Sequence, residues 1–326
     1  MQGLVTVFGG TGFVGAQVVR ALARSGARIR VAVRNPGRGY RLRMLGDVGQ
    51  IQIVQANIRN HASITRALEG AEACVNAAGI SYNLARQTFV SVNIEGAEAI
   101  AAACKAKKIG RMVQISTLGA DENSSSAYLR SKAQGEAAVR KLIPGAVIIR
   151  PAMAFGADDQ YFNQLGALAA SLPLLPLFGG GQARMQPVYI ADVAAAVARA
   201  VEDPDCAGHT YELGGPGVYT VREAYEMVCA VTYRRRPLIV LPWPAASMIG
   251  FAGDVLASLK GVVGLLPAPL LTRDQVEMLK SDNLVAEGAE GLAALGVRPT
   301  PIEPILPTYM YRYRKGGQFA VEPAKV

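Results

Sequence analysis

Tyr128 and Lys132 are the two side chains in this chain best suited to proton chemistry. Their spacing of four positions places the phenol and the ammonium group on one face of a helix. There the cation lowers the pKa of the phenol and can also donate to a sugar hydroxyl. Ser116 or Thr117, which precede Tyr128 by 12 and 11 positions, could complete a proton-handling trio. An ordinary surface pair with the same spacing is the alternative interpretation.

A glycine-rich turn near the start of the chain would position a ligand that carries phosphate. Residues 4–8 are predicted to form a buried strand, and residues 13–24 a helix with one apolar face. Glycines between them permit a sharp bend, close approach of backbone to phosphate, and tight packing of the helix on the strand. The pattern predicts a dinucleotide with its pyrophosphate at the helix N-terminus. The expected contacts are Gly9, Thr11, Gly12, Phe13, Val14 and Gly15.

Arg34 indicates which dinucleotide is bound. It ends a predicted strand at residues 28–34 and lies 19 positions after Gly15, where an acidic side chain would hold the ribose hydroxyls of NAD. A guanidinium suits a 2′-phosphate instead, and three further arginines follow by position 43. The position therefore favours NADP(H) over NAD(H). A solvated basic loop is the alternative.

Strands and helices continue to alternate along the chain. Further strands are predicted at residues 51–56, 73–77, 111–116 and 146–150. This order predicts an α/β fold with a doubly wound parallel sheet of the Rossmann type and a smaller C-terminal lobe. The nucleotide-binding domain is expected to comprise residues 1–156, rejoined by a helix near residues 192–201. The lobe is expected to comprise residues 157–326 and to include a C-terminal interaction segment.

The strand ends supply the remaining cofactor contacts. Adenine contacts are expected after the third strand, and small residues after the fourth let backbone lie along the cofactor. The nicotinamide ribose would meet the helix that carries Lys132. These contacts are Asn57, Ile58, Ala77, Ala78, Gly79, Ser116, Tyr128 and Lys132.

Composition argues against several other kinds of site. The four cysteines form no Cys-x-x-Cys pair, which is typical of reduced thiols in a cytoplasmic compartment. His61 and His209 have no partner at ligand spacing, so neither a metal site nor a Ser-His-Asp mechanism is expected. The formal net charge of +9 suits a nucleotide phosphate, anionic lipid or an acidic protein partner. The basic clusters match no nucleic-acid motif, so no nucleic-acid partner is expected.

The chain is strongly apolar between residues 242 and 266. No uncharged run there reaches the ~18 residues that a membrane span requires. The segment either packs into the lobe, as most apolar stripes do, or faces a membrane or a membrane subunit. A basic, tyrosine-rich segment at residues 309–315 is expected to share that contact. The apolar stripe is Met248, Ala252, Val255, Leu256, Leu259, Val263 and Leu266.

The order of these motifs resembles the extended and atypical short-chain dehydrogenase/reductase superfamily over nearly the whole chain. Segments 150–156, 186–193 and 211–223 are similar to further landmarks of that superfamily. The resemblance implies a cofactor contact at Pro151 and catalytic positions at Ser116, Tyr128 and Lys132. A working NADPH-dependent reductase, epimerase or dehydratase is one function that it implies.

Segments 124–136, 155–163 and 271–283 are similar to a narrower group, the dehydrogenase-like accessory subunit of respiratory complex I. This resemblance implies a tightly held NADPH, contacts with other complex I subunits, and a structural role near the quinone site without turnover. Ser116, Tyr128 and Lys132 would then be vestigial or would clamp the cofactor. No signal or transit peptide is expected, so the chain would lie peripherally on the cytoplasmic face of a bacterial inner membrane.

Overall fold

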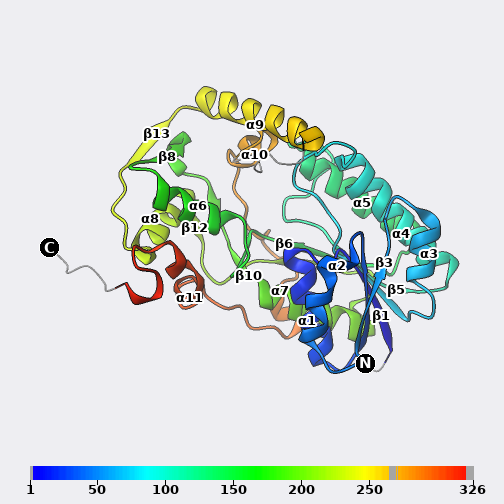
Figure 1. Ribbon diagram of the computed structural model, residues 1–326. Helices are drawn as coiled ribbons and strands as arrows, with labels where there is room; N and C mark the ends of the chain where they lie inside the picture. Colours follow the sequence, from blue (N-terminus) through cyan, green and yellow to red (C-terminus); the bar gives the residue numbers. More distant parts are fainter. Residues whose placement is uncertain (1–2, 264–268, 270, 321–326) are drawn as a thin grey trace.

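A seven-stranded parallel sheet forms the centre of the computed structural model, which describes residues 3–263, 269 and 271–320 (Figure 1). The strand order is β11-β6-β5-β4-β1-β2-β3, so the winding direction reverses between β1 and β4. The predicted doubly wound sheet is confirmed, and its cofactor crevice is expected at that reversal. The strands are β1 (Leu4–Phe8), β2 (Arg28–Val33), β3 (Ile51–Gln55), β4 (Ala73–Asn76), β5 (Arg111–Ile115), β6 (Val147–Pro151) and β11 (Thr210–Leu213).

Helices cover both faces of this sheet. Successive side chains of a strand point to opposite faces, so Val7 and Phe8 of β1 belong to two separate core clusters. The cluster around Val7 is closed by α1 and α7, which pack on each other, and the cluster around Phe8 by α3, α4 and α5. These helices are α1 (Phe13–Arg24), α3 (His61–Ala67), α4 (Glu95–Ala106), α5 (Ala127–Leu142) and α7 (Ile190–Glu202), and the short α2 (Pro36–Gly39) follows β2.

The smaller lobe has its own core, in which Phe162, Leu177 and Val228 are fully buried. Figure 1 shows it on the left, away from the large sheet. Three two-stranded sheets join β7 with β10, β9 with β12, and β8 with β13. The elements are β7 (Ala154–Phe155), α6 (Tyr161–Ser171), β8 (Leu175–Phe178), β9 (Arg184–Met185), β10 (Val188–Tyr189), β12 (Tyr219–Thr220), α8 (Val221–Val231), β13 (Leu238–Leu241), α9 (Trp243–Val263), α10 (Arg273–Met278) and α11 (Pro307–Met310).

β11 departs from the predicted division into domains. The sequence places residues 157–326 in the lobe, apart from the helix near residues 192–201, yet β11 pairs in parallel with β6 at the end of the large sheet. Tyr211 and Leu213 are buried there in the cluster closed by α1 and α7. A strand of four residues carries too few alternating positions to be distinguished from loop by pattern.

α9 leaves its large apolar side chains on the surface. Met248 and Val255 of the predicted stripe are 75% and 44% exposed, so of the two alternatives that the sequence left open, packing into the lobe does not hold for these side chains. Leu266 lies outside the described residues, and the side chain of Val263 is likewise not described. Within the described part of the chain, no helix is long and apolar enough to cross a membrane. The buried residues of α9 are small: Ala246, Gly250, Gly253 and Ala257.

The tyrosine-rich segment near the C-terminus packs on the lobe. Tyr309 is buried and its hydroxyl donates to Oδ2 of Asp159 at 2.6 Å. The hydroxyl of Tyr313 donates to Oδ1 of Asn163 at 3.0 Å. The expectation that these aromatic rings lie at a membrane surface is therefore wrong for Tyr309, because a core carboxylate binds its hydroxyl.

Candidate functional site

Two glycines in the turn between β1 and α1 have no room for a side chain. Gly9 has a φ of +75°, and a Cβ there would lie 2.6 Å from the backbone of Ala77. A Cβ on Gly15 would lie 2.3 Å from the carbonyl oxygen of Gly9. Only glycine at both positions lets α1 and the end of β4 approach β1 this closely.

Gly12 differs from these two because it is exposed beside the turn. A Cβ there would meet only the carbonyl oxygen of Gly9, at 3.3 Å. Gly12 is the N-cap of α1; no side chain caps this end, and its first turn has no acidic residue. The first N–H groups of the helix, including those of Phe13 and Val14, therefore lack partners within it. Together with the helix dipole, they suit an anionic pyrophosphate.

Arg34 follows β2 at the carboxyl edge of the sheet and is exposed. Its Nη1 donates to Oε1 of Gln87, in the segment between β4 and α4. The Nη1 of Arg59 donates to the carbonyl oxygen of Arg86 in the same segment, at 2.8 Å. Two guanidinium groups thus converge on this segment, and Arg34 presents positive charge of the kind that a 2′-phosphate requires.

The ends of β3 and β4 flank the glycine turn. Oδ1 of Asn57 accepts from the N–H of Arg59 at 3.1 Å, and the half-buried Ile58 packs toward α4. The N–H of Ala77 donates to the carbonyl oxygen of Phe8 at 3.0 Å, which attaches the segment after β4 to the end of β1. The structure therefore brings these predicted contacts to the same edge of the sheet as Gly9.

Asn76, which starts the run of small residues expected after the fourth strand, shapes the segment 77–79. It is buried, and its Nδ2 donates to Oε1 of Gln114 at 2.8 Å. Its Oδ1 accepts from the N–H of Ala78 at 3.1 Å. A Cβ on Gly79 would lie 3.7 Å from Nζ of Lys132, so this segment meets the helix α5 at Lys132.

Lys132 is buried despite its charge. Its Nζ donates to the carbonyl oxygen of Ile115 at 2.8 Å, which leaves further donors for ribose hydroxyls. Burial lowers the pKa of Lys132 to about 8, and Glu136 opposes that shift. Arg150 holds Glu136 through Nε and Nη2, at 3.0 and 2.7 Å from its two carboxylate oxygens.

Tyr128 lies one turn before Lys132 on α5. Burial raises the pKa of its phenol, a hydrogen bond with the side chain of Thr117 lowers it, and the charge of Asp274 raises it. The net shift is upward, so the phenol stays protonated at neutral pH, and the expectation that the Lys132 cation lowers this pKa is wrong. The ring packs against Phe89, with centroids 5.9 Å apart.

The structure distinguishes the two hydroxyls that the sequence left open. Thr117, not Ser116, contacts the phenol of Tyr128. Oγ of Ser116 is buried and has no hydrogen-bond partner among the described residues. Because a buried hydroxyl is normally paired, this atom marks a place for a polar group of a bound ligand or for water. Together with the uncapped N-terminus of α1, it fits a nucleotide cofactor.

Two further residues complete the site, and neither of them was predicted from the sequence to have a role in it. Asn93 is buried in a π-helical turn (Val90–Ile94), and its Nδ2 donates to Oγ of Ser131 at 3.0 Å. Asp274 comes from the lobe, and its Oδ2 accepts from the N–H of Tyr128, 146 positions away. A sequence pattern identifies neighbours along one element, so contacts of this range escape it.

Pro151 ends β6 beside the segment that follows β5. Its carbonyl oxygen accepts from the N–H of Leu118 at 2.9 Å. Pro151 and Ser116 thus lie at the same carboxyl edge of the sheet as the glycine turn. In the described part of the chain, no group of three histidine, cysteine or acidic residues is arranged to hold a metal ion.

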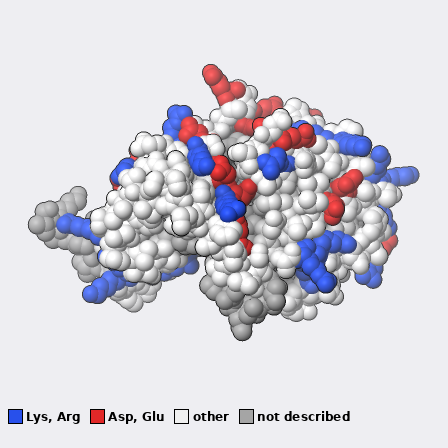
Figure 2. All heavy atoms as spheres, turned by 90° about the horizontal axis from the view of Figure 1, so that it is seen from above, with Lys and Arg blue, Asp and Glu red and all other residues white. Residues whose placement is uncertain are grey.

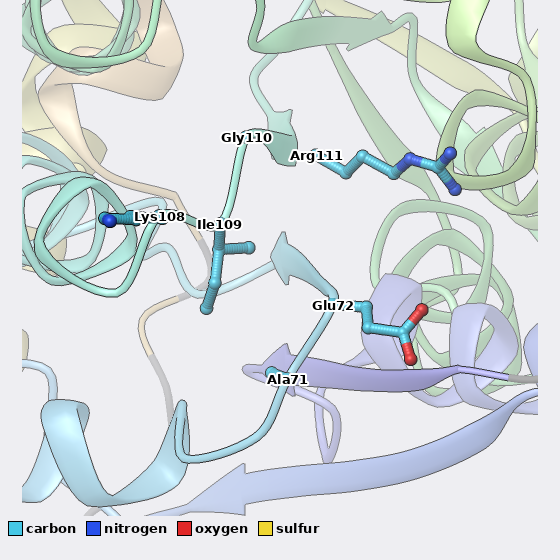
Figure 3. Close-up of a pocket in the computed structure, with 6 residues that line it drawn as sticks. All are labelled: Ala71, Glu72, Lys108, Ile109, Gly110 and Arg111. Carbon is cyan, nitrogen blue, oxygen red and sulfur yellow. The ribbon is translucent and has the colours of Figure 1, made fainter.

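The pocket in Figure 3 lies at the opposite edge of the sheet. Its lining residues lie at the start of β4 and β5, whereas doubly wound sheets bind ligands at the carboxyl ends of their strands. We therefore assign no nucleotide site to it. Its volume is about 480 Å³, and it is lined by Ala71, Glu72, Lys108, Ile109, Gly110 and Arg111.

Comparisons with known proteins agree with this geometry. The profile of the NAD dependent epimerase/dehydratase family matches residues 5–214. NADH dehydrogenase (ubiquinone) 1 alpha subcomplex subunit 9 of Arabidopsis thaliana mitochondria is 35% identical over 322 residues, covering 97% of this chain and 80% of that protein. A ceramide reductase of Caulobacter vibrioides is 36% identical over 194 residues, covering 60% and 59%. The solved NADPH-dependent quinone oxidoreductase of Escherichia coli, complexed with NADPH, shares the fold with a TM-score of 0.72 at 19% identity, covering 92% and 97%.

Proposed function

We propose, from the premise that the chain belongs to the NAD dependent epimerase/dehydratase family and within it to the alpha subcomplex subunit 9 family, that it is an accessory subunit of a proton-pumping NADH:quinone oxidoreductase. In this role it holds NADPH and stabilises the region near the quinone site. The observation that carries the proposal is an alignment spanning 97% of the chain, which must include most of the lobe. The match to the ceramide reductase covers only 60%.

The carboxyl edge of the sheet would hold the cofactor. N–H groups at the start of α1 would bind the pyrophosphate, Lys132 would donate to the nicotinamide ribose, and the orphaned Oγ of Ser116 would meet the nicotinamide end. Bound NADPH supplies a hydride at its nicotinamide. The proposed contacts are Gly9, Thr11, Gly12, Phe13, Val14, Gly15, Arg34, Asn57, Ile58, Ala77, Ala78, Gly79, Ser116, Tyr128, Lys132 and Pro151.

The preference for NADPH over NADH rests on Arg34. Its exposed guanidinium follows β2 and binds only a neutral amide oxygen, that of Gln87, among the hydrogen bonds that the described residues show for it. A phosphate dianion is a stronger acceptor for a guanidinium than an amide oxygen is. Arg34 would therefore exchange Gln87 for the 2′-phosphate when NADPH binds.

A structural role for the cofactor is supported by the contacts of Lys132. The raised pKa of the Tyr128 phenol disfavours the tyrosinate that oxidation of an alcohol would require, whereas a reductase needs the protonated phenol as its acid, so this pKa does not separate the two functions. Lys132 links α5 to the end of β5 through the carbonyl oxygen of Ile115. Both side chains hold the site together whether or not a hydride is transferred.

The large apolar side chains of α9 supply a surface for the membrane arm of the complex. We define the α9 face as Met248, Ile249, Phe251, Val255 and Leu259, which are 37–75% exposed. Figure 2, seen from above, shows a broad area without charged side chains on the left, where the lobe lies. A soluble monomer rarely exposes so many large apolar residues on one element. We therefore propose that the α9 face contacts membrane subunits or anionic lipid on the cytoplasmic face of the inner membrane.

Extraction of the native complex tests this proposal. Membranes are solubilised in mild detergent, the NADH:quinone oxidoreductase is purified, and its fractions are probed for this chain. We expect the chain to elute with the complex and NADPH or NADP⁺ to be released from it on denaturation. Elution of the chain as a free soluble oligomer, or release of NAD(H) alone, would contradict the proposal.

A reductase is the second candidate, because Tyr128, Lys132 and Thr117 lie together as a proton-handling trio would. A reductase would oxidise NADPH in the presence of a ketone, and Tyr128→Phe would abolish that turnover. We expect no turnover from the purified chain with ketones carried on long-chain lipids. Turnover that depends on Tyr128 would favour the reductase.

A further inference from the structure

Asp274 of the lobe closes the N-terminus of the helix that carries Tyr128 and Lys132. Its Oδ1 accepts from the N–H of Ala127 at 2.6 Å. Its Oδ2 accepts from Oγ of Ser126 at 2.8 Å and from the N–H of Tyr128 at 3.2 Å. A helix cannot satisfy these first N–H groups itself. The first turn of α5 therefore depends on a carboxylate delivered by another part of the molecule.

The position of Asp274 depends in turn on α9. A Cβ on Gly253 would lie 1.8 Å from the carbonyl oxygen of Leu271, and a Cβ on Gly250 would lie 2.9 Å from the nitrogen of Arg273. α9 thus rests directly on the backbone that leads into α10 and Asp274. Backbone in such close contact cannot slide without displacing its partner.

The same segment reaches the outer surface. The guanidinium of Arg273 lies 4.2 Å from the ring centroid of Phe251, a member of the α9 face. Figure 1 shows α9 running across the top of the molecule from β13 toward α5, with α10 beside it. A contact with Phe251 on the α9 face is therefore connected through Arg273 to the next residue in the chain, Asp274, whose carboxylate holds α5.

We propose that Asp274 is a positioning residue that sets the first turn of α5, and with it the phenol of Tyr128, according to the position of α9. This inference rests on the proposed nucleotide function. It goes further, because it couples occupation of the α9 face to nucleotide binding. By linkage, each event changes the affinity of the other by the same factor.

Trp243, the single tryptophan of the chain, provides the readout because it starts α9. Its emission can be transferred to a bound dihydronicotinamide, with an efficiency that reports how α9 lies relative to the cofactor. In Asp274→Ala we expect NADPH to bind roughly tenfold more weakly, a size typical of coupling between sites. At saturating NADPH we expect transfer from Trp243 to be lower than in the wild type. If Asp274 were only a helix cap, Asp274→Ala would lower thermal stability and leave the energy transfer from Trp243 unchanged.

Gly253→Ala tests the connection without touching the site. Its methyl group must push α9 away from Leu271, so we expect it to reproduce both effects of Asp274→Ala. The double variant should lose little more than either single variant, because both act on one contact. Asp274→Glu, which keeps a carboxylate, should recover part of the affinity. Asp282→Asn is the matched control, since Asp282 accepts from the N–H of Arg184 at 2.7 Å within the lobe.

Amide hydrogen exchange separates failure of this inference from failure of the proposed function. In the nucleotide-free protein, Gly253→Ala should speed exchange in the first turn of α5 and leave α4 unchanged. Unchanged exchange there, or additive effects of Gly253→Ala and Asp274→Ala on NADPH affinity, would overturn the inference. If the wild type binds no NADPH but exchange in α5 responds to Gly253→Ala, the nucleotide function fails and the coupling of α9 to α5 stands.

Discussion

Replacing Arg34 should change the cofactor preference by an amount that the structure sets. A bidentate guanidinium–phosphate contact has two charge-assisted hydrogen bonds, each worth about 1.5–3 kcal/mol. Arg34 must first release Oε1 of Gln87, a hydrogen bond to a neutral acceptor that offsets at most one of these two bonds, so at least one remains as the net gain. Because Arg34 is exposed, the lower end of the range applies, about 1.5 kcal/mol. Arg34→Ala should therefore weaken NADPH binding roughly tenfold.

Titration calorimetry of nucleotide-free protein with NADPH and with NADH measures this difference. NADH lacks the 2′-phosphate, so its affinity should not change in Arg34→Ala. Gln87→Ala should tighten NADPH binding, since Arg34 then has no amide to release. Arg24→Ala, in the last turn of α1, is the matched exposed arginine and should change neither affinity. Equal loss for NADPH and NADH in Arg34→Ala would refute the assignment of Arg34 to the 2′-phosphate.

Three further predictions follow from the same structure. Gly12→Val should leave the domain folded, since its side chain meets little protein, yet it should release NADPH and impair assembly of the complex. Tyr128→Phe should assemble normally and retain NADPH. Equal loss of respiration in both variants, with the Tyr128→Phe complex fully assembled, would indicate real turnover. Burial lowers the pKa of Lys132 from 10.5 to about 8, so between these pH values Lys132 carries a proton in the unfolded chain but not in the folded one. The free energy of unfolding, measured relative to Lys132→Met in denaturant titrations, should therefore rise by about 1.4 kcal/mol per pH unit from pH 8 to 10. A flat difference would contradict the burial of the ammonium group. Met248→Asp with Leu259→Asp should detach the chain from the purified complex while NADPH stays bound, and retention through a salt wash would show that the α9 face is not the contact.

The nucleotide-binding half of the molecule was predictable because its signals are local. Gly9 and Gly15 are required by contacts within one turn and its neighbouring strand end, so their spacing alone indicates the geometry. The choice between Ser116 and Thr117 was not predictable, because it depends on the side to which each residue turns after β5 ends. Successive residues of a strand face opposite sides, and the sequence does not show where that alternation stops.

The contacts made by Asp274 and Asn93 could not be read from the sequence for a different reason. Asp274 lies 146 positions from Tyr128, and tertiary packing, including that of α10 on α9, brings it to α5. Asn93 lies in a π-helical turn, whose extra residue breaks the regular helical spacing. Both residues position others, and a motif scan for groups that react would pass over them.

α9 shows why an apolar stripe on a helix does not by itself indicate which face is buried. Its glycine face packs because glycine lets the backbone of residues 271–273 come within contact distance, and this turns the larger side chains outward. Burying one such side chain against a partner contributes about 1.5–3 kcal/mol, whereas a basic residue near an anionic surface contributes about 1 kcal/mol. Two or three residues of the α9 face would therefore exceed the contribution of the exposed Arg273 beside Phe251. Attachment should depend on apolar contact and should resist salt, which distinguishes docking on a membrane subunit from adsorption to lipid by charge.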